Sequence, residues 1–217
     1  MFDQLLIYAT LAMGALPLVL MMPKARKLPE LRPIWPLAAL LAVSAVYETI
    51  GSVILKINTA FWFQFYLLPE FLCVLQFFNL LFNDRYKRLW LTFLIIFITS
   101  FLCLFSLRFF SPRLKTDFFL STIELGLVFI GSFIWFKDIF RKMKVESLWE
   151  SPTFYFISAL ILYFFGTFFL FLMRDIVFTP AEVGRHWVIN VVLSLFLGII
   201  LSIGIWIGRN KSTRFSG

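Results

Sequence analysis

The chain has 217 residues, of which 61% are hydrophobic and 30 are phenylalanine, and its formal net charge is +8 at pH 7. Soluble domains contain about 45–50% apolar residues, so this composition argues against a soluble fold and predicts a membrane protein. The basic residues form short clusters beside apolar segments, which fits membrane topology and binding of anionic lipid. We therefore expect the lipid bilayer, and no nucleic acid, as a partner.

Seven apolar segments follow one another along the chain, at roughly residues 5–22, 34–55, 60–82, 89–107, 118–136, 154–173 and 187–207. Each is near the ~20 residues that a helix needs to cross ~30 Å of hydrocarbon. The segments lack the alternation of apolar and polar residues that is typical of membrane strands. We predict one domain, residues 1–217, that is an all-α membrane protein with a bundle of seven transmembrane helices.

The basic residues also predict the orientation of this bundle. The first, third and fifth connections and the C-terminal tail hold 14 lysines and arginines, whereas the other connections hold six. The positive-inside rule then places the N-terminus outside and the C-terminus in the cytoplasm, in a bacterial inner membrane. The opening Met1-Phe2-Asp3-Gln4 carries no positive charge, so we expect no cleavable signal peptide.

Three glutamates, Glu48, Glu70 and Glu124, lie inside the predicted spans. An acidic side chain near the centre of a membrane helix opposes insertion by roughly 2.5–3.5 kcal/mol, so we expect these residues to face the bundle interior. With a rise of about 1.5 Å per residue, Glu48 and Glu124 lie roughly 10 Å, and Glu70 roughly 15 Å, from the outer ends of their spans. All three are therefore predicted in the outer half of the membrane.

Other polar residues recur at helical spacing on the same side. Tyr66, Glu70 and Cys73 share a face of the third span, and Asn190 and Ser194 follow His186 on the seventh. We predict a polar cavity that opens to the periplasmic side. Its candidate ligand-binding residues are Glu48, Tyr66, Glu70, Glu124, Tyr163, Thr167, Arg174, His186 and Asn190.

A structural role remains open for each of these residues. Buried polar side chains in membrane bundles often only bind neighbouring helices through hydrogen bonds. Arg174 can pair with Asp175, Glu182 or a lipid phosphate at the surface, and His186 can be a solvated residue at the membrane boundary.

The sequence carries no motif of a known membrane enzyme. The last span contains no lysine for a retinal Schiff base, and one histidine is too few for a membrane zinc hydrolase. There is no glycine-rich phosphate loop, and Cys73 and Cys103 lie in different spans. We expect no catalytic residue, no metal and no cofactor.

Three segments carry a resemblance to other proteins: Phe65 to Leu72, Ser151 to Phe156 and Tyr163 to Thr167. They resemble a loosely defined group of uncharacterised small seven-span proteins from Bacteroidetes, which is related to the N-terminal membrane modules of some sensor histidine kinases. The resemblance implies a sensory lineage and no defined activity. Because no kinase domain is expected after the last span, signalling would require a protein partner.

These observations lead to one functional prediction and two alternatives. The prediction is a membrane sensor or ligand-binding protein with a cavity open to the periplasm, which acts through a partner. A proton-coupled transporter of small solutes would use the same glutamates as proton carriers. A scaffold subunit of a larger complex would use them only for packing.

Overall fold

A computed structural model describes residues 2–22, 28–55, 60–83, 85–110, 117–142, 148–176 and 183–215. Within these ranges it gives the backbone without the side chains for residues 2–5, 52–54, 60–64, 108–110, 117, 142, 174–176, 183–187 and 211–215.

The described residues contain seven α-helices and no strand. The helices are α1 (Phe2–Met21), α2 (Trp35–Glu48), α3 (Ala60–Leu81), α4 (Lys87–Phe110), α5 (Asp117–Lys142), α6 (Pro152–Ile176) and α7 (Val183–Phe215). Short 3-10 helices, η2 (Arg32–Ile34) and η4 (Leu148–Glu150), precede α2 and α6. A π-helix, η3 (Thr49–Ile54), extends α2. The prediction of an all-α fold is confirmed for this part of the chain.

Among the described residues, five segments are long and apolar enough to cross a membrane, which indicates an integral membrane protein. They are Arg32–Gly51, Lys87–Leu107, Phe118–Arg141, Pro152–Met173 and Val188–Asn210. The apolar parts of α1 and α3 with described side chains, Leu6–Met21 and Phe65–Leu81, are shorter. Their complete helices have 20 and 22 residues, a length of about 30 Å or more. Membrane crossing by α1 and α3 therefore stays a prediction.

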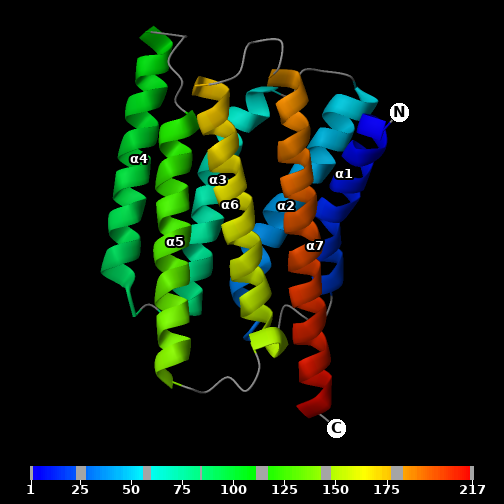
Figure 1. Cartoon of the computed structure of the whole chain (residues 1–217), viewed down its shortest axis with the longest axis vertical. Helices are drawn as coiled ribbons and strands as arrows, with labels where there is room; N and C mark the ends of the chain where they lie inside the picture. The colour runs from blue at the N-terminus through cyan, green and yellow to red at the C-terminus, as the bar shows by residue number, and fades with distance from the viewer. Residues whose placement is uncertain are drawn as a thin grey trace.

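The helices run alternately up and down, and the two termini lie at opposite ends of the bundle (Figure 1). α7 packs between α1 and α6, and α6 also packs against α5. α3 contacts α2, α4 and α5, while α4 lies at the edge of the bundle. We call the end with the N-terminus the N-terminal end and the opposite one the C-terminal end.

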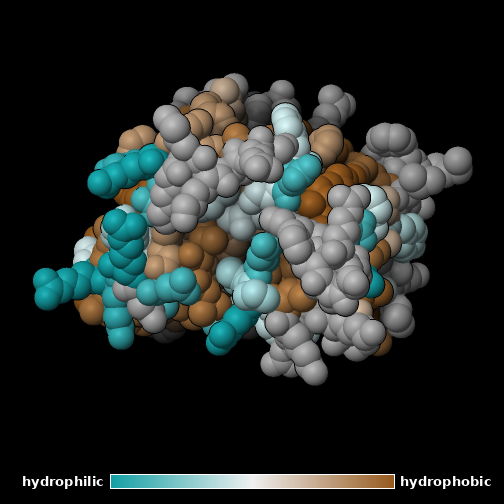
Figure 2. Space-filling model, turned by 90° about the horizontal axis from the view of Figure 1, so that it is seen from below, coloured by the Kyte–Doolittle hydropathy of each residue, from teal (hydrophilic) through white to brown (hydrophobic). Residues whose placement is uncertain are grey.

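Charged residues mark the C-terminal end. Hydrophilic side chains gather there around an apolar surface (Figure 2). Every lysine and arginine whose side chain is described lies at this end of its helix or in an adjoining turn: Arg32, Arg85, Lys87, Arg88, Lys137, Arg141 and Arg209. The Arg209 guanidinium donates to the Leu20 carbonyl at 3.0 Å, which joins the lower parts of α7 and α1.

Aromatic rings join α3 to α4 along their length. Phe65 meets Phe105 edge to face with ring centroids 6.2 Å apart, and Phe82 stacks on Trp90 at 5.8 Å. Between these pairs, Phe71 and Phe97 stack at 3.7 Å and are fully buried. Such aromatic pairs add about 0.5–1.5 kcal/mol each beyond the burial of their area. The three pairs set the register of this antiparallel helix pair.

Small residues allow close contact on the other side of the bundle. A Cβ atom on Gly198 of α7 would lie 2.7 Å from the backbone oxygen of Met13 on α1. A Cβ atom on Gly14 of α1 would lie 3.3 Å from the Cβ atom of Ala45 on α2. Glycine at such contacts lets membrane helices approach and gain van der Waals attraction.

Replacing Gly198 by alanine should therefore lower the thermal stability of the purified protein. The new methyl group meets a helix backbone that cannot rotate away, and overpacking of this kind costs about 1–3 kcal/mol. Gly126→Ala is the matched control, because its Cβ would meet only a Phe93 ring atom at an ordinary 3.9 Å. Equal melting temperatures for the two variants would contradict the close α1–α7 contact.

Candidate functional site

Two helices bury a glutamate at their contact with each other. Glu70 of α3 is 4% exposed and Glu124 of α5 is 2% exposed. α3 and α5 are in direct contact, and the two carboxyl groups lie within range of electrostatic interaction. If both carboxyl groups were ionised in these buried surroundings, their two negative charges would repel each other strongly.

Tyr163 connects this pair to two further helices. Its hydroxyl group donates a hydrogen bond to the Glu70 carboxylate and also meets the hydroxyl group of Ser194 on α7. Tyr163 lies on α6 and interacts electrostatically with Glu124 as well. One tyrosine side chain thus joins polar groups from α3, α5 and α7.

A second set of polar residues lies one helical turn nearer the N-terminal end. α3, α5 and α7 run away from that end and α6 runs toward it (Figure 1). We call Glu70, Glu124, Tyr163 and Ser194 the lower tier, and Tyr66, Ser121, Thr167 and Asn190 the upper tier. Each residue of the upper tier is three or four positions from a residue of the lower tier on the same helix, which places it about one turn, or about 5 Å, nearer the N-terminal end.

Several oxygen atoms in the two tiers are buried without a hydrogen-bond partner in the described part of the chain. They are Glu70 Oε1, Glu124 Oε1, Ser121 Oγ, Thr167 Oγ1 and Asn190 Oδ1. Buried polar groups in folded proteins are generally hydrogen-bonded, and leaving them unpaired costs about 1–3 kcal/mol each. The concentration of such atoms on four adjacent helices makes this region suited to binding a polar solute.

The tiers are rich in acceptors and poor in positive charge. The ion pair that the structure shows among its described residues, Arg85 with Asp138, lies at the C-terminal end. No described lysine or arginine lies in either tier. The arrangement can therefore accept hydrogen bonds from a solute, attract a cation, or hold a proton between its carboxyl groups.

Glu48 occupies a different structural setting from the other two glutamates. It is the last residue of α2 and is half-buried, and α2 packs against α3. The backbone turns into the π-helix η3 directly after it, with the Leu55 amide donating to the Ile50 carbonyl at 2.9 Å. π-Helical turns are rare and often occur at functional sites. The uninterrupted α-helix expected over residues 34–55 thus ends at Glu48.

Two predicted site residues have no described side chain. Arg174 lies near the C-terminus of α6 and His186 in the first turn of α7, both at the N-terminal end of the bundle. Their backbones continue the helical faces of Thr167 and Asn190 upward. Their participation in the site, like that of the other candidates, stays a prediction.

No cluster of three or more histidine, cysteine, aspartate or glutamate side chains with metal-binding geometry occurs among the described residues. Cys73, one turn below Glu70 on α3, is a half-buried free thiol that interacts electrostatically with Glu70, and Cys103 is exposed.

Two features of the site had weak sequence signals or none. Ser194 shares a face with Asn190 by its spacing, but only the packing of α7 against α6 brings it to Tyr163. The Ser194 hydroxyl also donates to the Asn190 carbonyl at 2.9 Å. The π-helix η3 follows from no recognisable pattern in Thr49–Ile54.

Comparison of the chain with models of protein families, with curated proteins and with solved structures found no match. The function must therefore be argued from the residues of the two tiers.

Removing the Tyr163 hydroxyl group should destabilise the protein. Tyr163→Phe leaves the Glu70 carboxylate and the Ser194 hydroxyl without a common partner in a buried site, at a cost of about 1–3 kcal/mol. Tyr155→Phe on the same helix is the control, since the described residues offer no hydrogen bond to the Tyr155 hydroxyl group. Thermal unfolding that leaves both variants equal to the wild type would contradict the bridging role of Tyr163.

Proposed function

We propose that this protein is a sensor or ligand-binding protein of a bacterial inner membrane, which binds a small polar solute between α3, α5, α6 and α7. The observation that carries the proposal is the set of five buried, unpartnered oxygen atoms in the two tiers. A solute with several hydrogen-bond donors would satisfy them, and the gain would be large because the site excludes bulk water.

The proposed orientation makes the site accessible from the periplasm. The described basic side chains gather at the C-terminal end (Figure 2), whereas the upper tier lies toward the N-terminal end. The positive-inside rule then supports a periplasmic N-terminus and a cytoplasmic C-terminus. A solute would enter past Arg174 and His186, reach Asn190 and Thr167, and end at Glu70 and Glu124.

The chemistry of the site favours a ligand with a positive charge or with several N–H or O–H groups. Glu70, Glu124 and Asn190 supply carboxyl and amide oxygens, which accept hydrogen bonds. Small amines and protonated amino compounds combine both properties. If the ligand also carries an anionic group, Arg174 at the entrance would bind it.

A sensor of this size would pass its signal to a protein partner. Filling the site would hold α3 and α5 in a fixed position against α6 and α7, because Tyr163 of α6 forms hydrogen bonds to Glu70 of α3 and Ser194 of α7 and interacts electrostatically with Glu124 of α5. A shift of α3 would move the turn that connects it to α4 at the predicted cytoplasmic surface. The resemblance to membrane modules of sensor kinases supports this class of function.

Proton-coupled transport is the second candidate, and the electrostatic interaction between the buried Glu70 and Glu124 favours it. Acidic residues inside membrane bundles often carry protons in transporters, and Tyr163 provides a hydroxyl group next to both carboxyls. Under this alternative the site would open alternately to the two sides of the membrane.

A thermal-shift screen tests the proposed site. The purified wild type is mixed with a panel of simple amines, polyamines and amino acids at pH 7, and a compound present at a hundredfold excess over its dissociation constant should stabilise the protein by about 2.7 kcal/mol. The double variant Glu70→Gln/Glu124→Gln should lose this shift, while Glu150→Gln, at an exposed residue of η4 before α6, should keep it.

Three outcomes separate the candidates. A shift that survives in the double variant would place binding outside the two tiers and would contradict the proposal. The absence of a shift with any compound would also contradict it and would support a scaffold role. If a stabilising compound is found, its uptake into proteoliposomes along an imposed proton gradient is measured. Uptake that Glu70→Gln abolishes would assign transport, and absence of uptake would leave the sensor.

A further inference from the structure

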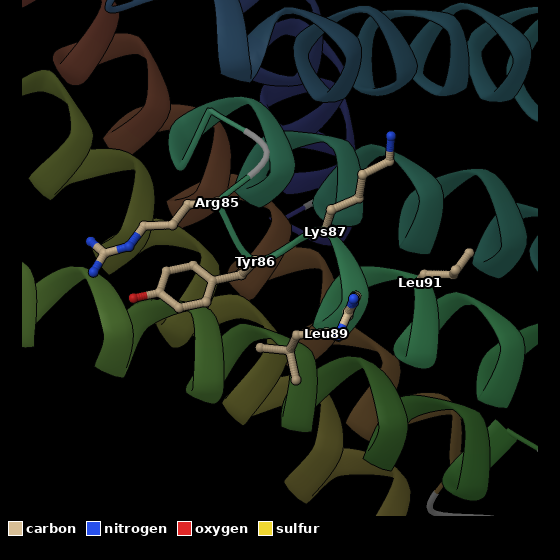
Figure 3. Close-up of a pocket in the computed structure, with 6 residues that line it drawn as sticks. Arg85, Tyr86, Lys87, Leu89 and Leu91 are labelled. Atoms are coloured by element: carbon tan, nitrogen blue, oxygen red, sulfur yellow. The ribbon is translucent and has the colours of Figure 1, made fainter.

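The turn between α3 and α4 forms an open hollow with a volume of about 630 Å³ at the C-terminal end. Its lining residues are Arg85, Tyr86, Lys87, Arg88, Leu89 and Leu91. Figure 3 shows the side chains of Arg85 and Lys87 reaching out on opposite sides of the turn, with Leu89 and Leu91 further along α4. The hollow thus joins a cationic part to an apolar part.

A rigid aromatic base holds this turn. Trp90 stacks on Phe78 and Phe82 with ring centroids 5.8 Å away in each case, and Tyr86 meets Phe82 edge to face at 5.5 Å. Asn83, two residues after the end of α3, has a left-handed conformation with a φ of 48°, which is common for asparagine after a helix. The Arg85 amide donates to the Phe82 carbonyl at 3.1 Å. The positions of the basic residues are therefore set by packed rings.

The positive charges of the turn are only partly balanced. Arg85 pairs with Asp138 of α5 at 3.2 Å and lies over the Tyr86 ring at 5.2 Å. Lys87 and Arg88 form no ion pair with any described residue and are exposed. They occupy the first turn of α4, where the helix dipole is also positive, so an anion bound there would be stabilised. Asp84, in the same turn, lies outside the described residues.

The apolar part of the hollow continues along α4. Few of the apolar residues of α4 are buried, and Leu91, Ile95 and Ile96 are exposed on its surface. In a membrane these side chains would face lipid acyl chains. A ligand that fills the hollow therefore has an anionic head beside Lys87 and Arg88 and a hydrocarbon tail along α4.

We propose that this hollow binds the phosphate group of an acidic phospholipid in the adjacent leaflet. Lys87 and Arg88 bind the headgroup, while Arg85 is held aside by Asp138 and forms one wall. Leu89 and Leu91 contact the first part of an acyl chain. This site is separate from the polar tiers, and it stands whether or not those tiers bind a solute.

The test compares lipid binding by the full-length protein in detergent, measured by native mass spectrometry with added phosphatidylglycerol or phosphatidylcholine. The wild type should retain phosphatidylglycerol preferentially. The double variant Lys87→Gln/Arg88→Gln should lose roughly thirtyfold in affinity for it, because each of the two basic residues near the lipid headgroup contributes about 1 kcal/mol and 1.4 kcal/mol corresponds to a factor of ten. Phosphatidylcholine binding should stay unchanged.

Two comparisons distinguish this site from general electrostatic attraction and from a soluble ligand. Lys137→Gln/Arg141→Gln removes two exposed charges at the same end, on α5 and outside the hollow, and should leave phosphatidylglycerol binding near the wild-type value. An equal loss in both double variants would overturn the proposal. Inorganic phosphate at 1 mM is about a thousandfold above a micromolar protein concentration. If it displaces phosphatidylglycerol, the hollow binds a soluble anion, and this result would overturn the proposal as well.

Discussion

The burial of Glu70 beside Glu124, without a described cation near them, is the constraint on which the rest of the account depends. Two carboxyl groups in such surroundings must be stabilised by hydrogen bonds, by a proton or by a bound cation, since an isolated buried charge is very unfavourable. Tyr163 of α6 supplies part of that stabilisation through its hydrogen bond to Glu70, and Ser194 of α7 is hydrogen-bonded to Tyr163 in turn. The site therefore exists only when α3, α5, α6 and α7 are assembled.

The packing around the site divides the bundle into contrasting sides. Close helix contacts through Gly14 and Gly198 hold α1 against α2 and α7. On the other side, aromatic pairs such as Phe71 with Phe97 join α3 to α4, and α4 is otherwise exposed. The polar tiers lie where the two sides meet, with residues on α3, α5, α6 and α7. A change of charge in the tiers would therefore alter the interaction between these two well-packed groups of helices.

Much of the helical framework could be predicted from the sequence, because a backbone in hydrocarbon must satisfy its own hydrogen bonds and apolar segments of about 20 residues do so as helices. The spacing of Tyr66 and Glu70, or of Asn190 and Ser194, also predicts common faces. The electrostatic interaction of Glu70 with Glu124 depends on how each helix is rotated about its axis. Since phenylalanine serves equally for core and lipid contact, the sequence leaves that rotation open.

Other features depend on contacts between distant segments. The ion pair of Arg85 with Asp138 joins residues that are 53 positions apart in the sequence, and the π-helix after Glu48 has no recognisable local pattern. Side chains at the predicted entrance, Arg174 and His186, lie outside the described part of the chain. The framework is thus a property of composition and length, whereas the site is a property of packing.

A double-mutant cycle on Glu70 and Glu124 tests the central claim most directly. The unfolding free energies of Glu70→Gln, Glu124→Gln and the double variant are measured under the same conditions. If the two carboxyl groups share one site, the second substitution acts on surroundings that the first has changed, and the effects should deviate from additivity by about 0.5–3 kcal/mol. Additivity within about 0.5 kcal/mol, as for independent residues, would contradict a common site.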